Sequence, residues 1–225
     1  MEPAVWDGKY AGEDFAYGKE PNEFVRQCVE QYLKEPCHVV ELASGEGRNV
    51  AYLAGVGHRV TAVDFSPVGL EKTSALTRAL HGEEALKRVE GVQADIMSWR
   101  PTTPADIMSW RPHDAVDAVV LSFCHVPARE RRGFVEGLVE MLHPGGLVIC
   151  EVFHPDQVAK GYRQTSGGPT DPTMMVTLQE MRELLGSSRG TEIRAEEVEY
   201  VLKEGKLHDG LGAVTRYLWR KGASA

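Results

Sequence analysis

The sequence predicts an α/β fold, with a seven-stranded, mostly parallel sheet, helices on both faces and an antiparallel hairpin at the C-terminal end. Three observations predict it. Short apolar runs alternate with segments of helical periodicity along most of the chain, which is typical of parallel strands joined by right-handed crossovers. A glycine-containing turn follows the first of these runs. The last two runs are joined by a short turn rather than a helix, which indicates a hairpin.

The expected strands are short apolar runs bounded by turn residues. They cover residues 37–42, 58–63, 89–94, 115–122, 147–152, 192–202 and 211–220. The turn Glu204-Gly205-Lys206 joins the last two of them.

The expected helices have apolar residues at three- and four-residue spacing. The first covers residues 24–33 behind Pro21, a favourable first-turn residue. Ser66 and Pro67 open the second, and a third has its apolar stripe at residues 134–142. The last has Thr177 as its cap.

The composition of the chain limits the classes of partner that we expect. The 225 residues fit one domain, and the net charge of −8 leaves only Arg129, Arg131 and Arg132 as a local basic cluster. Nucleic acid is therefore not an expected partner, since its binding relies on phosphate neutralisation. The four cysteines lack metal-ligand spacing, so we expect reduced thiols and no metal. Without a signal or spanning run, we expect a cytoplasmic protein with no membrane partner, as a monomer or homodimer.

Within this single domain, residues 1–36 are expected to form an N-terminal lid and the first helix, and residues 37–225 the main body. A tandem duplication interrupts that body, because residues 94–101 recur unchanged as residues 105–112. We interpret the duplication as a surface insertion between the third and fourth strands. The first copy is expected to end the third strand, because Pro104 before the second copy lacks the N–H that a central strand needs.

The strongest functional signal is the segment 39–49, an apolar strand that runs into a small-residue turn and then a helix. Gly45 and Gly47 allow a ligand to approach the backbone closely. In open α/β sheets, nucleotides bind in the crevice at the carboxyl end of the first strand. A purely steric strand–helix turn is the alternative, since Ala43 replaces one glycine of the usual pattern.

Two acids follow the next two strands. Asp64 lies at roughly the ~20-residue distance from the glycines that is expected of a ribose-binding carboxylate. Its alternative role is to cap the next helix, for which Ser66 is better placed. Asp95 can accept a hydrogen bond from an exocyclic amine while the next backbone N–H meets a ring nitrogen, which would recognise adenine. The alternative for Asp95 is an ordinary loop residue.

These motifs resemble the ordered motifs of class I S-adenosylmethionine-dependent methyltransferases. The matching segments are 41–49, 63–66, 94–95 and 142–146. The chain is more closely similar to the branch related to tellurite-resistance and thiopurine methyltransferases, through segments 6–10, 17–22 and 47–49. The resemblance covers nearly the whole chain. Its departures are Ala43 in place of glycine and the duplicated segment, which leaves both Asp95 and Asp106 as candidates for the adenine contact.

The resemblance implies a Rossmann-like methyltransferase domain over residues 37–225 that uses S-adenosyl-L-methionine. Glu41 would contact the methionine amino group directly or through water, and Asp64 would bind the ribose. Phe65 would pack on the adenine, whose polar edge would meet Asp95 and the Ile96 N–H. The complete implied cofactor set is Glu41, Ala43, Ser44, Gly45, Gly47, Arg48, Asn49, Asp64, Phe65, Ser66, Asp95, Ile96 and Ser122.

The acceptor side is less defined. His125 follows the fourth strand, where acceptors meet the methyl group, so it is the best-placed general base, with a structural role as the alternative. Trp6, Tyr10 and Tyr17 are candidates for an aromatic lid, or else for core packing. The long loop 153–175, which begins with Phe153, is expected to shape the acceptor pocket.

The predicted reaction is methyl transfer to a small molecule, with soft nucleophiles such as thiols, selenium or tellurium compounds as candidate acceptors. Two alternatives share the binding motifs. A non-catalytic S-adenosylmethionine-binding module has the same residues, since binding does not certify turnover. An NAD(P)-dependent oxidoreductase uses the same turn and acid, but it would be expected to have a second substrate domain, for which this chain leaves little room.

Overall fold

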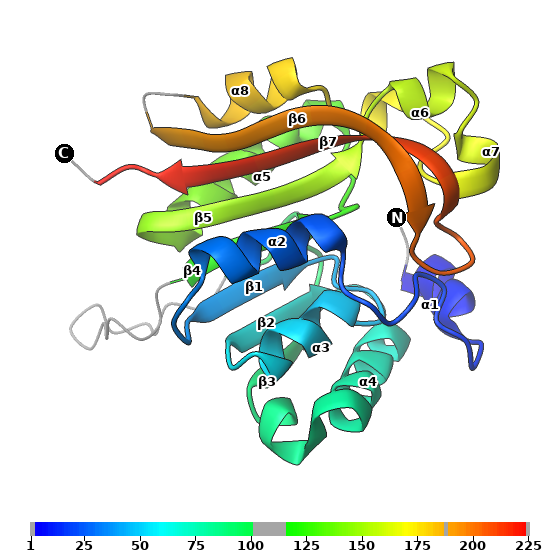
Figure 1. Ribbon diagram of the computed structural model, residues 1–225, viewed down its shortest axis with the longest axis vertical. Helices are drawn as coiled ribbons and strands as arrows, with labels where there is room; N and C mark the ends of the chain where they lie inside the picture. The colour runs from blue at the N-terminus through cyan, green and yellow to red at the C-terminus, as the bar shows by residue number, and fades with distance from the viewer. Residues whose placement is uncertain (1–2, 101–115, 187–188, 224–225) are drawn as a thin grey trace.

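The computed structural model describes residues 3–100, 116–186 and 189–223. Its sheet has seven strands in the order β3-β2-β1-β4-β5-β7-β6 (Figure 1). They are β1 His38–Leu42, β2 Arg59–Asp64, β3 Val89–Gln93, β4 Val116–Ser122, β5 Leu142–Phe153, β6 Gly190–Lys203 and β7 Asp209–Lys221. Strands β1 to β5 pair in parallel, whereas β7 is antiparallel to both of its neighbours. The predicted fold class is confirmed.

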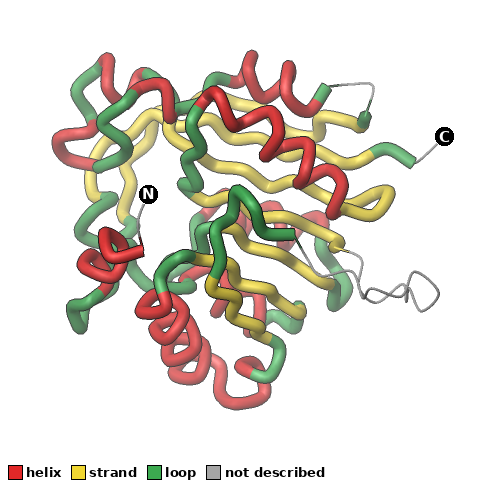
Figure 2. Tube along the Cα trace, turned by 180° about the vertical axis from the view of Figure 1, so that it is seen from behind, coloured by secondary structure: helices red, strands yellow, loops and turns green. Residues whose placement is uncertain are grey.

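Helices cover both faces of the sheet (Figures 1 and 2). On one face, α2 Glu23–Tyr32, α3 Arg48–Gly55 and α4 Pro67–Leu86 contribute to one buried cluster with the strands. On the other face, α5 Ala128–Met141 and α8 Leu178–Leu185 contribute to a second cluster. Alternate residues of a strand point to opposite faces, so Val39 belongs to the first cluster and Val40 to the second.

The parallel register places functional residues at one edge of the sheet. Leu42 of β1 is level with Val63 of β2, and Asp64 is level with Gln93 of β3. The residues that follow β1, β2, β3 and β4 therefore come together at the carboxyl edge. This is the edge at which α/β folds bind nucleotides.

Two segments are more regular than predicted. Residues 1–36 contain α1 Pro3–Tyr10 in addition to the predicted helix, and Asn22 rather than Pro21 caps α2 by accepting from the Val25 N–H. The sequence does not reveal α1, because its few apolar residues do not form a stripe on one side.

The loop 153–175 contains α6 Asp156–Ala159, α7 Arg163–Ser166 and a 3₁₀ turn, Pro172–Met174. These helical turns are too short for helical periodicity to reveal them in the sequence.

The first copy of the duplicated segment continues β3. The N–H of Ala94 donates to the carbonyl of Asp64 at 3.0 Å, which extends the pairing of β2 with β3 by one bond. Met97 and Trp99 then pack against the core cluster of α5. The second copy, including Asp106, lies outside the described residues. None of the helices within the described ranges has the length and apolar character to cross a membrane.

Candidate functional site

The glycine turn after β1 takes left-handed backbone conformations at Ala43, Gly45 and Gly47, with φ of 57°, 57° and 83°. Ala43 therefore occupies a conformation in which glycine is normally favoured, which explains why a glycine is usual there. At Gly47 a Cβ would lie 2.4 Å from the Thr73 side chain, so only glycine fits. The turn leads into α3, and the first N–H groups of a helix have no partner within the helix, an arrangement that suits an anionic or polar ligand.

Glu41 lies under this turn at the end of β1 and is buried. Its Oε1 accepts a 2.7 Å hydrogen bond from Asn49 Nδ2, whereas its Oε2 is buried with no partner among the described residues. The Ser44 hydroxyl is also buried, with no partner in the part of the chain that the structure describes. Burial raises the pKa of Glu41 to about 7, despite the opposing effects of Asn49 and Arg48. Unpaired buried polar atoms are costly, so the turn fits a ligand that brings hydrogen-bond donors to Glu41 and Ser44.

Asp64 closes the turn from β2. Its two carboxylate oxygens each accept a 2.8 Å hydrogen bond, one from the Gly45 N–H and one from the Ser66 N–H. Burial raises its pKa, and the backbone bonds oppose that shift. Ser66 rather than Asp64 caps α4, since its hydroxyl accepts from the Gly69 N–H. A carboxylate has room for further donors, so Asp64 can still accept from a ligand.

The residues after β3 lie at the same edge. The Asp95 carboxylate accepts a 2.8 Å hydrogen bond from the Met97 N–H and so stabilises the turn that follows β3. Ile96 and Phe65 are partly buried, and Ile96 packs against the core. The structure thus brings Asp95, Ile96 and Phe65 to the carboxyl edge that also carries Asp64.

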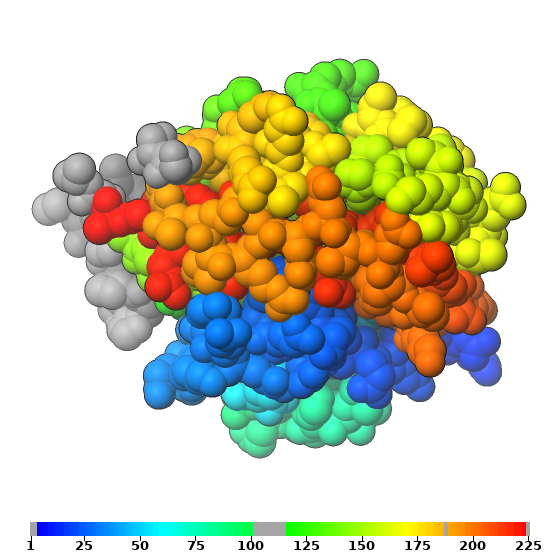
Figure 3. Space-filling model, turned by 45° about the horizontal axis from the view of Figure 1, so that its top comes forward, coloured from blue at the N-terminus to red at the C-terminus, as the bar shows by residue number. Residues whose placement is uncertain are grey.

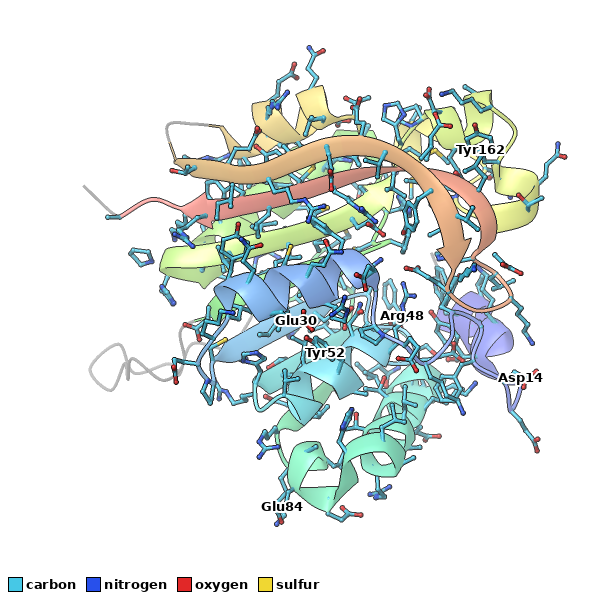
Figure 4. All side chains as sticks on the ribbon, in the orientation of Figure 1. Asp14, Glu30, Arg48, Tyr52, Glu84 and Tyr162 are labelled. Carbon is cyan, nitrogen blue, oxygen red and sulfur yellow. The ribbon has the colours of Figure 1, made fainter. Side chains whose placement is uncertain are left out.

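Arg48 connects this turn to the rest of the molecule (Figure 4). Its guanidinium donates to the Tyr17 carbonyl at 3.3 Å and lies 3.4 Å from the Ser122 hydroxyl at the end of β4. It also forms a 2.8 Å ion pair with Glu204 in the β6–β7 turn, in which both side chains are nearly buried. Arg48 and Asn49, expected to contact a cofactor, therefore already hold protein groups in place.

The N-terminal segment lies directly on the glycine turn. Tyr10 is 4% exposed, and a Cβ placed on Gly45 would be 3.0 Å from its hydroxyl. Trp6 stacks on Tyr10 with ring centroids 5.8 Å apart. Lys72 of α4 holds the segment by donating to three of its carbonyls, those of Tyr10, Gly12 and Asp14, and to the buried carboxylate of Glu46. Of the predicted lid residues, Tyr10 thus lies on the turn, Trp6 packs on Tyr10, and Tyr17 packs on His208.

An aromatic cluster forms the other side of the edge, and it contains Tyr17, Phe123, His125, Phe153 and His208. Their ring centroids lie 4.4–5.6 Å apart in five pairs. Phe123, directly after β4, has a left-handed φ of 52°, a strained conformation that is often found at functional sites. Sequence reasoning identified three members of this cluster and missed Phe123 and His208.

His125 is held by its Nδ1, which is 3.3 Å from the Met174 carbonyl. Its Nε2 is buried and has no partner among the described residues. Burial, with smaller contributions from His208 and Arg131, lowers the pKa of His125 to about 3. The ring is therefore neutral at physiological pH, with Nδ1 as donor and a free lone pair on Nε2.

No cluster of three or more His, Cys, Asp or Glu side chains with metal-binding geometry occurs in the part of the chain that the structure describes. The edge combines a glycine turn, two strand-end acids and an aromatic wall. Residues 39–146 match the family described as Methyltransferase domain. The match runs from β1 to the start of β5, and the class predicted from the motifs agrees with it.

A relative of known name also matches part of this chain. A demethylmenaquinone methyltransferase of Clavibacter sepedonicus is 37% identical over 127 residues, which are 55% of this chain and 45% of that protein. The match thus spans less than half the length of that relative.

Two solved structures have the same fold. One, described as "Conversion of a Disulfide Bond into a Thioacetal Group during Echinomycin Biosynthesis", has a TM-score of 0.70 at 17% identity, covering 99% of this chain and 93% of its own. The other is the N-methyltransferase NodS of Bradyrhizobium japonicum WM9 in complex with S-adenosyl-L-homocysteine, with a TM-score of 0.62 at 15% identity and 97% of each chain covered. The predicted Rossmann-like methyltransferase fold is confirmed.

Proposed function

We propose that this chain is an S-adenosylmethionine-dependent methyltransferase that acts on a small-molecule acceptor. The observation that carries the proposal is the glycine turn, where Glu41 Oε2 and the Ser44 hydroxyl are buried with no partner among residues 3–100, 116–186 and 189–223. A methionine moiety has an ammonium and a carboxylate. The ammonium would pair with Glu41, and the carboxylate would accept from Ser44 and from N–H groups at the start of α3.

The remaining cofactor groups have candidate partners at the same edge. Asp64 retains capacity for the ribose hydroxyls, and Phe65 is half-buried beside it. We assign the adenine edge to Asp95 and the Ile96 N–H, because Ala94 continues β3 directly into them. Arg48, Asn49, Ser66 and Ser122 would act by shaping the turn, since their polar groups already bond to the protein.

S-Adenosylmethionine, when bound, supplies a methyl group that its sulfonium has already activated. The chain's task is then to align an acceptor and to exclude water. Tyr10 covers the turn with Trp6 stacked on it, and Tyr17 and Phe153 belong to the aromatic wall beside His125. We propose that His125 meets the acceptor through its Nε2. Its low pKa makes that nitrogen a hydrogen-bond acceptor rather than a strong base.

Two classes of acceptor fit this wall. Soft nucleophiles, namely thiols and selenium or tellurium compounds, need no strong base, and they are the acceptors implied by the tellurite-resistance and thiopurine branch. A quinol is the second candidate, because the curated relatives are named demethylmenaquinone methyltransferases.

The free cysteines of the described residues suit a reducing compartment, so we propose a cytoplasmic enzyme, monomeric or homodimeric.

Calorimetry tests the cofactor, and a labelled-methyl assay tests the reaction. S-Adenosylmethionine and S-adenosylhomocysteine should bind, and NAD should not compete with them. Labelled methyl groups should then pass to at least one member of a panel of thiols, selenite, tellurite and a naphthoquinol. Cofactor binding without transfer to any of them would favour a non-catalytic binding module, and comparable binding of NAD would favour an oxidoreductase.

A further inference from the structure

His208 is the buried polar residue in this region that neither the motifs nor the proposed function explains. It lies in the turn between β6 and β7 and is 4% exposed. The turn is closed by bonds from the Glu204 N–H to the His208 carbonyl and from the His208 N–H to the Gly205 carbonyl. It is docked on the N-terminal segment through a bond from the Leu207 N–H to the Ala16 carbonyl. Figure 3 shows the tip of this hairpin beside the N-terminal segment.

Three aromatic rings from three separate segments contact the His208 ring. The centroid distances are 4.6 Å to Tyr17, 4.4 Å to Phe123 and 5.3 Å to Phe153, all with edge-on geometry. Phe123 directly follows β4, and Phe153 stacks on His125. His208 therefore belongs to the aromatic wall on which the acceptor is proposed to lie.

Other buried imidazoles of the described ranges, His38 and His58, have polar partners. His38 Nε2 lies 2.9 Å from the Thr61 hydroxyl, and His58 Nδ1 lies 3.3 Å from the Cys37 N–H nitrogen. In contrast, Nδ1 of His208 is buried with no hydrogen-bond partner among the described residues. Such an atom calls for an explanation, and His125 Nε2, at the same aromatic wall, shares the property.

Glu204 lies behind the ring, with its Oε2 3.7 Å from His208 Nδ1, just beyond hydrogen-bonding distance. Burial tends to raise the pKa of Glu204, but His208 and Arg48 outweigh it, so the pKa is lowered and the group stays a carboxylate. Burial lowers the pKa of His208, and Glu204 opposes that shift. A neutral imidazole thus stands beside a fixed carboxylate, the pairing that prepares a histidine to accept a proton.

We propose that His208 is a catalytic residue that binds the acceptor and takes its proton, and that the acceptor is a neutral aromatic molecule with an O–H, N–H or S–H group. The inference rests on the proposed function. Its physical basis is the aromatic wall, which suits a planar ring, and the two imidazoles, which offer lone pairs to a hydrogen-bond donor. The Arg48 guanidinium, 6.0 Å from the Phe123 ring centroid, is already paired with Glu204, so an anionic acceptor would have to compete with that carboxylate.

The step balances in atoms and charge. The lone pair of the acceptor's O, N or S atom forms the new bond to the methyl carbon, while the carbon–sulfur bond breaks and its electron pair stays on sulfur. The acceptor's proton moves to His208 Nε2 and later to water. The Nδ1–H of His208 then donates a hydrogen bond to Glu204, whose negative charge balances the imidazolium. His125 Nε2 accepts a hydrogen bond that orients the acceptor.

Two probes test this role: one has a hydroxyl that can donate a hydrogen bond, and in the other that hydroxyl is replaced by a methoxy group. The protein is first saturated with S-adenosylhomocysteine, and calorimetry then measures binding of 1-naphthol and of 1-methoxynaphthalene. Wild type should prefer 1-naphthol by about tenfold, as expected for one good hydrogen bond. His208→Phe, which keeps an aromatic ring, should bind both alike, and His208→Gln should recover part of the preference. His81→Gln, at an exposed site on α4, is the matched control.

Histidine ¹⁵N spectra give a second readout that a merely structural role would not move. The Nε2 resonance of His208 should shift on addition of 1-naphthol and not of the methyl ether, and Glu204→Gln should lower the pKa of His208. Equal binding of the two probes by wild type, binding of neither, or an unchanged preference in His208→Phe would overturn the proposal. Failure of S-adenosylhomocysteine itself to bind would instead refute the proposed function, and this inference with it.

Discussion

The proposed cofactor side of the candidate site takes most of its polar groups from residues 41–66, with Asp95 and Ile96 beyond them, whereas the proposed acceptor side draws on segments from Tyr17 to His208. In the first region, backbone geometry positions the polar groups, through left-handed turn residues and N–H groups that donate to Asp64. In the second region, side chains from four segments meet, and the local sequence of one segment does not determine how it packs on the others. Binding of the cofactor and selection of the acceptor therefore rest on different kinds of structure, which mutations can separate.

The largest expected effect is at the cofactor side. Asp64→Ala should weaken S-adenosylhomocysteine binding by about 1.5–3 kcal/mol, the range for hydrogen bonds to a charged group. Calorimetry measures the affinity, with circular dichroism to confirm the fold, because the Gly45 and Ser66 N–H groups also lose their acceptor. Glu71→Ala, an exposed change on α4, serves as the control. An unchanged affinity would remove Asp64 from the cofactor site.

The second prediction concerns the N-terminal segment, which we propose is a lid. Lys72→Met removes the ammonium that holds three carbonyls and Glu46, so the free energy of opening should fall by about 2 kcal/mol. Hydrogen exchange should speed up over residues 10–18 and not in β1. In wild type, S-adenosylhomocysteine should slow exchange of the same amides. Lys87→Met, at an exposed site, is the control. Equal protection in both variants, with and without ligand, would mean fixed core packing.

The third prediction uses the pKa of Glu41, raised by burial to about 7. An ammonium pairs with the carboxylate and not with the acid, so binding must release the proton where Glu41 is protonated. The affinity for S-adenosylhomocysteine should therefore rise about tenfold between about pH 6 and about pH 8 and level off above. Glu41→Gln should bind more weakly at the higher pH and lose this dependence. A flat profile in wild type would exclude the contact.

The smallest expected effect distinguishes the two copies of the duplicated segment. Asp95→Ala should weaken cofactor binding by about 1 kcal/mol, the value of a single ordinary hydrogen bond, whereas Asp106→Ala should leave it unchanged. Deletion of residues 94–104 leaves one intact copy in the same flanking context and should give a folded, active protein. The reverse pattern would show that the first copy is the insertion.

The sequence predicted the strands well because each is a short apolar run whose burial follows from its composition. It also placed Ser66 and Thr177 as helix caps, and both accept the expected backbone N–H. The turn and Asp64 were predictable because motif and geometry are contiguous there. His208 and Glu204 were not, because a polar turn between two strands carries no local signal of the rings and the guanidinium that bury it. Their environment exists only in the folded chain.

The contact between the β6–β7 turn and residues 16–18 has a consequence for the order in which the protein is made. A nascent chain that has emerged as far as β5 already contains the turn, Asp64, His125 and most of the sheet. The N-terminal segment, although synthesised first, still lacks the partner that Leu207 and Gly205 provide, almost two hundred residues later. Long-range pairings of this kind form late in folding. A chain cut short after β5 would thus contain the proposed cofactor ligands and four members of the aromatic wall, but neither His208 nor the turn that holds the N-terminal segment.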